Sequence, residues 1–257
     1  MGRAKEIIVK VIPSKIANEF VKKHHYSGKV VPNSTLHFGC FLDNALHGVM
    51  SYGSSMVKHK VIHYVENTKW NEFLELNRMA FDEYLPKYSE SRCIAISIML
   101  LKKNAPHIKW ILSFSDGNLC GDGTIYRASG FKLIGVNKNN STYLMPNGEV
   151  TCSLTSSAHR TKESNGASGV KWILNNGGKK LDGFQIRYIY LIDKTCKITV
   201  PILPFSKIDE MGAGMYKGKK ITLAERQKCD KSVMVAQQAS SLKEGFDSTL
   251  SLKVSEI

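Results

Sequence analysis

Residues 74–135 decide the fold that we expect for this chain. They read L-E-L-N-R-M-A-F at 74–81, Y-L-P-K-Y-S-E-S-R at 84–92, W-I-L-S-F-S-D-G at 110–117 and I-Y-R-A-S-G-F-K-L-I-G at 125–135. Their hydrophobic pattern changes from strand to helix, to strand, to short helix and to strand, which predicts a βαβ arrangement. Sheets of this kind bind ligands at the carboxyl ends of neighbouring strands.

The preceding residues predict a strand, a helix and a hairpin. Residues 6–11 are β-rich, residues 14–24 place apolar side chains on one helical face, and residues 36–53 read as two strands joined by an Asp43-Asn44 turn. The apolar run at 93–103 predicts a helix buried against the sheet. We therefore expect an α/β (α+β) fold with a mixed twisted sheet flanked by helices.

Composition divides the chain into four parts. We expect a catalytic core at 1–150, a linker or mobile loop at 151–182, a β-containing extension packed on the core at 183–215, and a basic, flexible tail at 216–257. In the extension, residues 198–205 are expected to pair with the strand before the Lys194-Thr195 turn.

The charge of the chain favours a polyanionic partner. The 257 residues carry a formal net charge of +14, and nucleic acid is the first candidate because lysine and arginine neutralise its phosphates. A soluble basic protein without such a partner is the alternative. The six cysteines contain no C-x-x-C pair and indicate reduced thiols, and no apolar run approaches the ~18 residues of a membrane span. We expect a soluble protein in the cytoplasm.

Lysines near the expected site loops and in the tail are the DNA-binding candidates, although lysines near helix ends are ordinary on any surface. They are Lys22, Lys23, Lys29, Lys58, Lys60, Lys217, Lys219 and Lys220.

Asp116 is the first candidate for a general base, because it lies at the carboxyl end of a core strand. An Asp-Gly pair after a strand also serves as turn chemistry, and Tyr126 is equally readable as a core tyrosine. His24 and His25 are readable as a solvated helix end that interacts with the helix dipole. The histidines do not form a recognised metal-binding motif with the candidate residues, so a metal site there would need tertiary assembly.

The order of elements resembles that of the GNAT acetyltransferase fold. Residues 126–131, Y-R-A-S-G-F, are similar to the Y-x-x-x-G-F segment of that family, in which the tyrosine protonates a departing thiolate. The resemblance places the phosphate-binding element at the start of the helix after Pro86, where the usual glycines are absent. The donor-binding candidates are Ser89, Ser91, Arg92 and Ser115.

A closer resemblance covers most of the chain. The motifs H-H-Y-S-G at 24–28, the four stretches quoted above, R-Y-I-Y-L-I-D at 187–193 and V-P-I-L-P-F-S at 200–206 resemble the Mom family of bacteriophage DNA-modification proteins. The resemblance implies a GNAT-like transferase that adds a carbamoylmethyl group to N6 of adenine and so protects phage DNA from host restriction. It also implies an acetyl-coenzyme A type donor and, less directly, iron.

The same resemblance places four residues in the active site: Asp116, Tyr126, His25 and Tyr26. Because N6 of a paired adenine is engaged inside the duplex, the base of double-stranded DNA would be flipped out, and a tyrosine could stack on it.

Three other functions remain open from the sequence. A conventional amino-methyltransferase would need an N-P-P-Y-like tetrapeptide, whereas S-F-S-D-G follows the strand here. An acyltransferase for a protein or small amine would leave the positive charge incidental. A non-catalytic DNA-binding protein on a GNAT scaffold is the third. The oligomeric state, including a dimer, is left open.

Overall fold

We describe the protein from a computed structural model, which covers residues 3–139, 141–152, 169–216 and 218–226. Its helices and strands in chain order are η1 (Arg3–Glu6), β1 (Ile8–Val11), α1 (Ser14–His24), β2 (Ser34–Leu42), β3 (Ala45–Gly53), α2 (Lys58–Val61), η2 (Ile62–Tyr64), β4 (Phe73–Phe81), α3 (Ser89–Asn104), β5 (Trp110–Asp116), α4 (Thr124–Ala128), β6 (Lys132–Lys138), β7 (Thr142–Leu144), β8 (Val150–Cys152), α6 (Val170–Asn175), β9 (Lys179–Lys180), β10 (Phe184–Leu191), α7 (Ser206–Glu210), β11 (Met215–Tyr216) and β12 (Lys219–Lys220).

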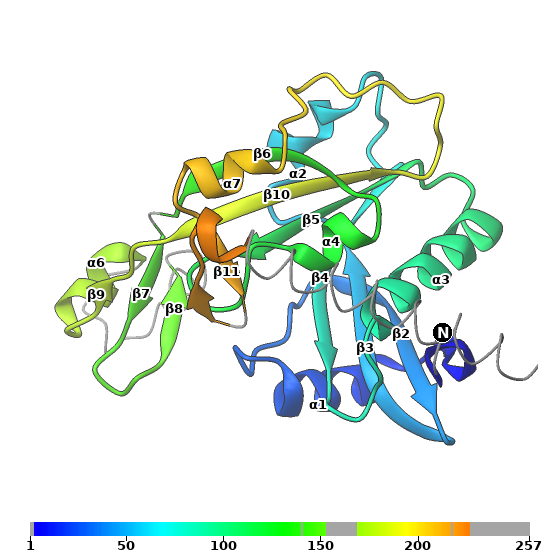
Figure 1. The fold of residues 1–257 in the computed structure, drawn as a ribbon, viewed down its shortest axis with the longest axis horizontal. Coiled ribbons are helices and arrows are strands. Elements are labelled where there is room, and N and C mark those ends of the chain that lie inside the picture. The colour runs from blue at the N-terminus through cyan, green and yellow to red at the C-terminus, as the bar shows by residue number, and fades with distance from the viewer. Residues whose placement is uncertain (1–2, 140, 153–168, 217, 227–257) are drawn as a thin grey trace, which may run out of the picture.

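A seven-stranded mixed sheet crosses the molecule in the order β1-β2-β3-β4-β5-β10-β6 (Figure 1). Only β4 and β5 are paired in parallel; the other neighbours are antiparallel. The β2-β3 hairpin turns at Asp43 and Asn44, which have φ values of 50° and 62°, as a tight two-residue turn requires. The fold class predicted from the sequence is confirmed.

Helices cover both faces of the sheet. On one face, α3 contributes Cys93, Ile94 and Ile98 to the largest apolar cluster. On the other face, α1 packs Ala17 and Val21 against the sheet, and residues of α2 and η2 enclose a second cluster around Trp110. The buried helix predicted at 93–103 is therefore confirmed. Within the described ranges, no helix is long and apolar enough to cross a membrane.

The segment expected as a β extension on the core supplies a strand of the main sheet, and the pairing expected within that segment is wrong. Strand β10 lies inside the sheet between β5 and β6, pairing Tyr188 with Ser113 on one side and with Leu133 on the other. Because both edges of β10 are occupied, residues 198–205 cannot pair with it as expected. Ile198 and Leu203 form single bridges elsewhere, to Val65 and Leu133.

The parts expected as linker and tail also contain ordered structure. Strands β7, β8 and β9 form a small separate sheet, next to α6 at the left of Figure 1. Residues 218–226 make backbone hydrogen bonds to the body of the protein, among them Gly218 N–H to Cys120 C=O at 2.8 Å. Residues 153–168 and 227–257, which carry the rest of those two expectations, lie outside the described residues.

Gly123 tests how tightly the loop before α4 packs against β10. It has a φ of +85°, and a Cβ there would lie 2.4 Å from Tyr188 Cε2. Gly148 has a φ of +82° with nothing within 4 Å. Both Gly→Ala variants meet a left-handed backbone cost of about 1–2 kcal/mol, but only Gly123→Ala adds an overlap cost of about 1–3 kcal/mol. Urea unfolding of both variants measures this difference, and equal losses would contradict the packing described.

Candidate active site at the split between β4 and β5

The parallel pair β4 and β5 separates part-way along its length. Pairing runs from Phe73 opposite Trp110 to Leu76 opposite Ser113 and ends there, although β4 continues to Phe81. At the last pair the Ser113 hydroxyl donates to the Leu76 carbonyl at 3.0 Å. Beyond this point the facing backbone groups of the two strands have no partner in the ladder, which opens a split in the middle of the sheet.

A β-bulge at Asn77 sets the direction of Arg78. Ser51 of β3 pairs with Arg78 and Tyr52 pairs with Leu76, so Asn77 is the extra residue. Side chains alternate along a strand, and the extra residue moves Arg78 to the face that carries Glu75 and α1. In the sequence, strict alternation of apolar residues breaks at Asn77-Arg78, which indicates a bulge but gives Arg78 no role.

Arg78 is held by backbone carbonyls. Its Nε donates to Lys29 C=O at 2.9 Å and its Nη1 donates to Asn77 C=O at 3.1 Å. Burial lowers the pKa of Arg78, and the nearby acidic groups of Tyr26, Glu75 and Asp116 act against this shift. Within the described ranges it forms no ion pair at 4.0 Å or less. A partly buried guanidinium without an ion-pair partner is suited to bind an anionic group.

The loop after α1 reaches the end of β5. The Tyr26 hydroxyl donates to Asp116 Oδ2 at 3.1 Å, and the Asn118 N–H donates to Asp116 Oδ1 at 2.8 Å. Half of the Tyr26 side chain is exposed, yet burial of its hydroxyl and the nearby charge of Asp116 raise the pKa of Tyr26. Tyr26 is thus a protonated donor at neutral pH, and Asp116 is an oriented acceptor at the strand end.

His25 is neutral beside this pair. Its ring lies 4.3 Å from that of Tyr26, between centroids, and its Nδ1 accepts the Ser27 N–H at 3.2 Å. Burial, and then the charge of Arg78, lower the pKa of His25 to about 4. Because Nδ1 is an acceptor, the proton of the neutral ring lies on Nε2, where it can be donated.

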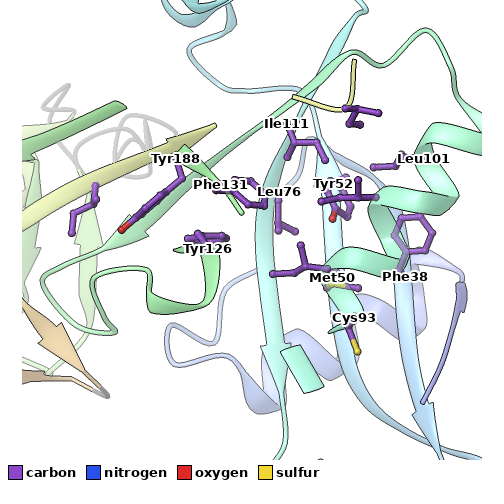
Figure 2. Packing of buried hydrophobic residues seen from close by; sticks show 14 of the residues in the cluster. Phe38, Met50, Tyr52, Leu76, Cys93, Leu101, Ile111, Tyr126, Phe131 and Tyr188 are labelled. Carbon is purple, nitrogen blue, oxygen red and sulfur yellow. The ribbon is translucent and has the colours of Figure 1, made fainter. Parts of the chain in front are cut away.

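Tyr126 approaches the split from the opposite face of the sheet. It lies on α4, packed against Phe131 and Tyr188 (Figure 2), and only 8 % of it is exposed. Burial raises the pKa of Tyr126 to about 12. The Ser113 hydroxyl, which donates to Leu76 C=O, is its polar neighbour on β5 and acts to lower the pKa of Tyr126.

Asp116 and Tyr126 do not point at each other across one simple pocket. Ser113, the partner of Tyr126, lies three positions before Asp116, so the two side chains leave β5 on opposite faces. Arg78 and Cys120 nevertheless interact electrostatically with both Tyr126 and Asp116. The split therefore connects the two halves of the candidate site.

The four donor-binding candidates differ in what they can offer. The Ser89 hydroxyl is buried and donates to Pro86 C=O at 2.5 Å, and Ser115 donates to Gly121 C=O at 2.5 Å. Ser91 donates to Tyr88 C=O at 3.2 Å. The three serine hydroxyls therefore donate their protons to the local backbone and not to a bound donor molecule. Arg92 donates one nitrogen to Lys5 C=O at 3.1 Å, while its buried Nε has no partner within the described structure.

The N-terminus of α3 also fits a phosphate. The helix is 16 residues long, follows Tyr88 at a φ of 71° and receives no side-chain cap. Ser89 N–H donates to Pro86 C=O at 3.3 Å, which leaves the Glu90 and Ser91 N–H groups of the first turn available. Together with Arg92 Nε, they are the groups of this chain that could hold the diphosphate of a coenzyme A type donor.

The sequence matches the model of the Mom protein family over residues 6–207. The chain belongs to the Mom family. It is 31 % identical over 195 residues to the methylcarbamoylase Mom of Escherichia phage Mu, which covers 76 % of this chain and 79 % of that protein. The resemblance identified from the motifs is confirmed.

Solved acetyltransferase structures resemble this Mom family chain more distantly. A probable acetyltransferase from Staphylococcus epidermidis is 12 % identical, with 72 % of this chain and 98 % of that chain covered and a TM-score of 0.43. A GNAT acetyltransferase from Elizabethkingia anophelis with acetyl-CoA bound is 12 % identical, with 72 % and 97 % covered and a TM-score of 0.41.

One of the lysines predicted to bind DNA is misassigned. Lys58 is 6 % exposed, its ammonium lies 4.5 Å from the Trp70 ring centroid, and burial lowers its pKa. It cannot contact a phosphate without leaving this position. Lys60 is exposed, but it lies on α2. In Figure 1, α2 is at the opposite end of the sheet from α1, which precedes the loop of the candidate site.

The other lysines occupy two regions of this Mom family protein. Lys22 and Lys23 are exposed in the last turn of α1, and Lys29 pairs with Glu149 at 2.5 Å. Lys219 and Lys220 are exposed on β12, and Lys217 lies outside the described residues. Their contact with DNA stays a prediction.

Metal ligands do not gather in the part of the chain that the structure describes. No group of three His, Cys, Asp or Glu side chains there has a geometry that could hold an ion.

The neutral state of His25 has a measurable consequence. The pKa of His25 falls from its ordinary 6.5 to about 4 on folding, so the unfolded chain binds more protons between these values. The His25 contribution to stability is complete above pH 6.5 and is lost progressively as the pH falls toward 4. Two-dimensional NMR of the ring measures the titration directly.

A His25→Gln variant is the control, because it should remove this part of the pH dependence of the unfolding free energy. Titration of the His25 ring near pH 6.5 would contradict the buried, neutral state.

Proposed function

We propose that this chain is a DNA-modifying transferase that adds a carbamoylmethyl group to N6 of an adenine flipped out of double-stranded DNA. The observation that supports it best is the Tyr26–Asp116 pair beside the partly buried Arg78 at the split in the sheet. The relation to the methylcarbamoylase of phage Mu supports the substrate class. On this proposal the modification shields phage DNA from host restriction.

Asp116 is the base in this proposal. The lone pair of adenine N6 is delocalised into the ring, so the nitrogen needs a fixed position and loses a proton as the new N–C bond forms. Asp116 Oδ2 would accept that proton, while Asn118 N–H fixes the carboxylate through Oδ1. Tyr26 would orient the flipped adenine by stacking on it, and the neutral His25 would orient it by donating a hydrogen bond from Nε2.

The other half of the site would serve the donor. The first turn of α3 and Arg92 would hold its phosphates, and Arg78 and Tyr126 would stabilise charge that develops in the split. A coenzyme A thioester would supply an activated acyl carbon. Attack of N6 on its carbonyl would break the C–S bond, release the thiolate and give an N-acetyl product. A carbamoylmethyl group is joined through its methylene carbon, so its transfer would need a donor with the leaving group on that carbon. The mass of the product distinguishes acetyl from carbamoylmethyl transfer.

Nucleoside mass spectrometry of DNA from cells that express the chain tests the proposal. The carbamoylmethyl increment on deoxyadenosine is the expected result. Unmodified DNA together with an acetylated protein or small amine would instead indicate an acyltransferase. Unmodified DNA together with tight, salt-sensitive DNA binding would indicate a non-catalytic DNA-binding protein.

Removal of the Asp116 carboxylate or of the Tyr126 hydroxyl should abolish modification and leave DNA binding intact. We expect Asp116→Asn and Tyr126→Phe each to lower kcat by about 100-fold or more, the range of general acid–base catalysis. DNA affinity, measured by fluorescence anisotropy, should stay near that of the wild type. Loss of folding in both variants would assign these residues a structural role instead.

Tyr26 has a matched control on the same molecule. The Tyr84 hydroxyl donates to Asp43 Oδ2 at 2.6 Å on the far hairpin, in the same kind of Tyr–Asp pair. Tyr26→Phe should reduce modification by about 10-fold or more, because the acceptor loses its orientation. Tyr84→Phe should leave the rate unchanged. Equal rates in the two variants would remove Tyr26 from the proposed site.

A further inference from the structure

Asp122 is a buried carboxylate in the loop between β5 and α4. Its side chain is 0 % exposed and accepts hydrogen bonds from the Thr124 hydroxyl at 3.1 Å and the Met215 N–H at 3.2 Å. The Arg226 guanidinium, from the far end of the described chain, forms an ion pair with it. Arg127 lies at 4.0 Å on its other oxygen.

Arg226 is shared between two buried acids. Its Nε lies 3.0 Å from each carboxylate oxygen of Asp209 on α7, and its Nη2 reaches Asp122. The Asp209 side chain is 4 % exposed. A carboxylate removed from water in this way is stable in its charged form only while its cationic partner is present.

The hairpin β11–β12 fastens to the same loop through the backbone. Asp122 N–H donates to Met215 C=O at 3.0 Å, and Gly218 N–H donates to Cys120 C=O at 2.8 Å. The C-terminal segment, residues 206–216 and 218–226, thus holds the loop by its main chain and by Arg226.

The other end of this loop is Asp116 itself. The Asp116 carbonyl accepts the N–H groups of Cys120 at 3.1 Å and Gly121 at 3.2 Å, and Ser115 Oγ donates to Gly121 C=O at 2.5 Å. Because the loop is this short and closed on itself, a shift of Cys120 or Gly121 moves Asp116. The segment that holds Asp122 therefore also fixes the strand end that carries Asp116.

We propose that Arg226 is a positioning residue: by pairing with Asp122 it locks the C-terminal segment onto the loop and sets the geometry of Asp116. This inference rests on the proposed function for its catalytic readout only. Arg226 touches no substrate and acts through Asp122 and the loop.

Arg226→Ala in the full chain tests the proposal. We expect kcat for DNA modification to fall by about 10- to 100-fold, as for a displacement of catalytic groups by about 1 Å. The KM for DNA should change little. Millimolar guanidinium should restore part of the rate by occupying the vacated site, whereas urea at the same concentration should not. Arg226→Lys should retain more activity than Arg226→Ala.

Arg3→Ala is the matched control. Arg3 also pairs with an aspartate, Asp43, at 2.5 Å, but both side chains are about half exposed and lie on the β2-β3 hairpin side of the molecule. This variant should keep the wild-type kcat. Unchanged kcat in Arg226→Ala, or a loss that guanidinium does not restore, would overturn the positioning role.

A second readout does not depend on catalysis. Cys120 is exposed in the loop, whereas Cys40 and Cys93 are buried. Alkylation by iodoacetamide, followed at Cys120 by peptide mass spectrometry, should be several-fold faster in Arg226→Ala because the loop is released. Guanidinium should slow it again. One outcome is that the wild type modifies no DNA while Cys120 is still alkylated faster in Arg226→Ala. In that case the proposed function fails, and the role of Arg226 in holding the loop stands.

Asp209→Asn covers the case in which Arg226→Ala does not fold. This variant removes one of the two carboxylates that hold Arg226 and leaves Asp122 paired, so Cys120 alkylation should rise above that of Arg3→Ala. If Cys120 in Asp209→Asn is alkylated at the same rate as in Arg3→Ala, the proposed role of Arg226 in holding the loop is overturned.

Discussion

The separation of β4 from β5 is the constraint on which the rest of the site depends. The two strands share ladder bonds from Phe73 to Leu76 and then diverge, so the middle of an otherwise continuous sheet contains unpaired backbone. Ser113 marks the point of divergence, since its hydroxyl donates to Leu76 C=O and is the polar neighbour of Tyr126. Unpaired backbone groups inside a protein need a partner, and a bound ligand is the partner that a binding site provides.

The charges around the split are arranged so that the site is complete only with a ligand. Arg78 is partly buried and is held by carbonyls, while Asp116 is held by an N–H and a hydroxyl. His25 is neutral and adds no charge. The Asn77 bulge and the loop after α1 bring these groups together, and each is fixed by backbone bonds. Such preorganisation is what electrostatic stabilisation of a reaction requires.

Local pattern predicted much of the fold and little of its assembly. The order of the strands and of α1, α3 and α4, and the bulge at Asn77, follow from periodicity, which is a local property. The short helices α2 and η2 lie in a stretch without such a pattern. The insertion of β10 between β5 and β6 does not follow from periodicity, because strand pairing across 70 residues leaves no trace in either strand. The burial of Lys58 under Trp70 was missed for the same reason.

In the candidate site too, local sequence pattern identified single residues but not the contacts between distant ones. Asp116 was identifiable as a strand-end carboxylate, but its pairing with Tyr26, 90 positions earlier, was implied only by the family motifs. Arg78 was visible in the E-L-N-R motif and was given no role, since its direction depends on the bulge. Asp122 and Arg226 carried no signal, because an aspartate before a glycine reads as a turn and the partner lies 104 residues away.

Amide hydrogen exchange of β4 and β5, measured by NMR with and without acetyl-coenzyme A, tests the split most directly. The account predicts slow exchange up to Leu76 and Ser113, fast exchange at alternate amides beyond them, and protection of those amides when the donor is added. Slow exchange through to Phe81 and Asp116 in the free protein, or fast exchange that a saturating donor leaves unchanged, would contradict it.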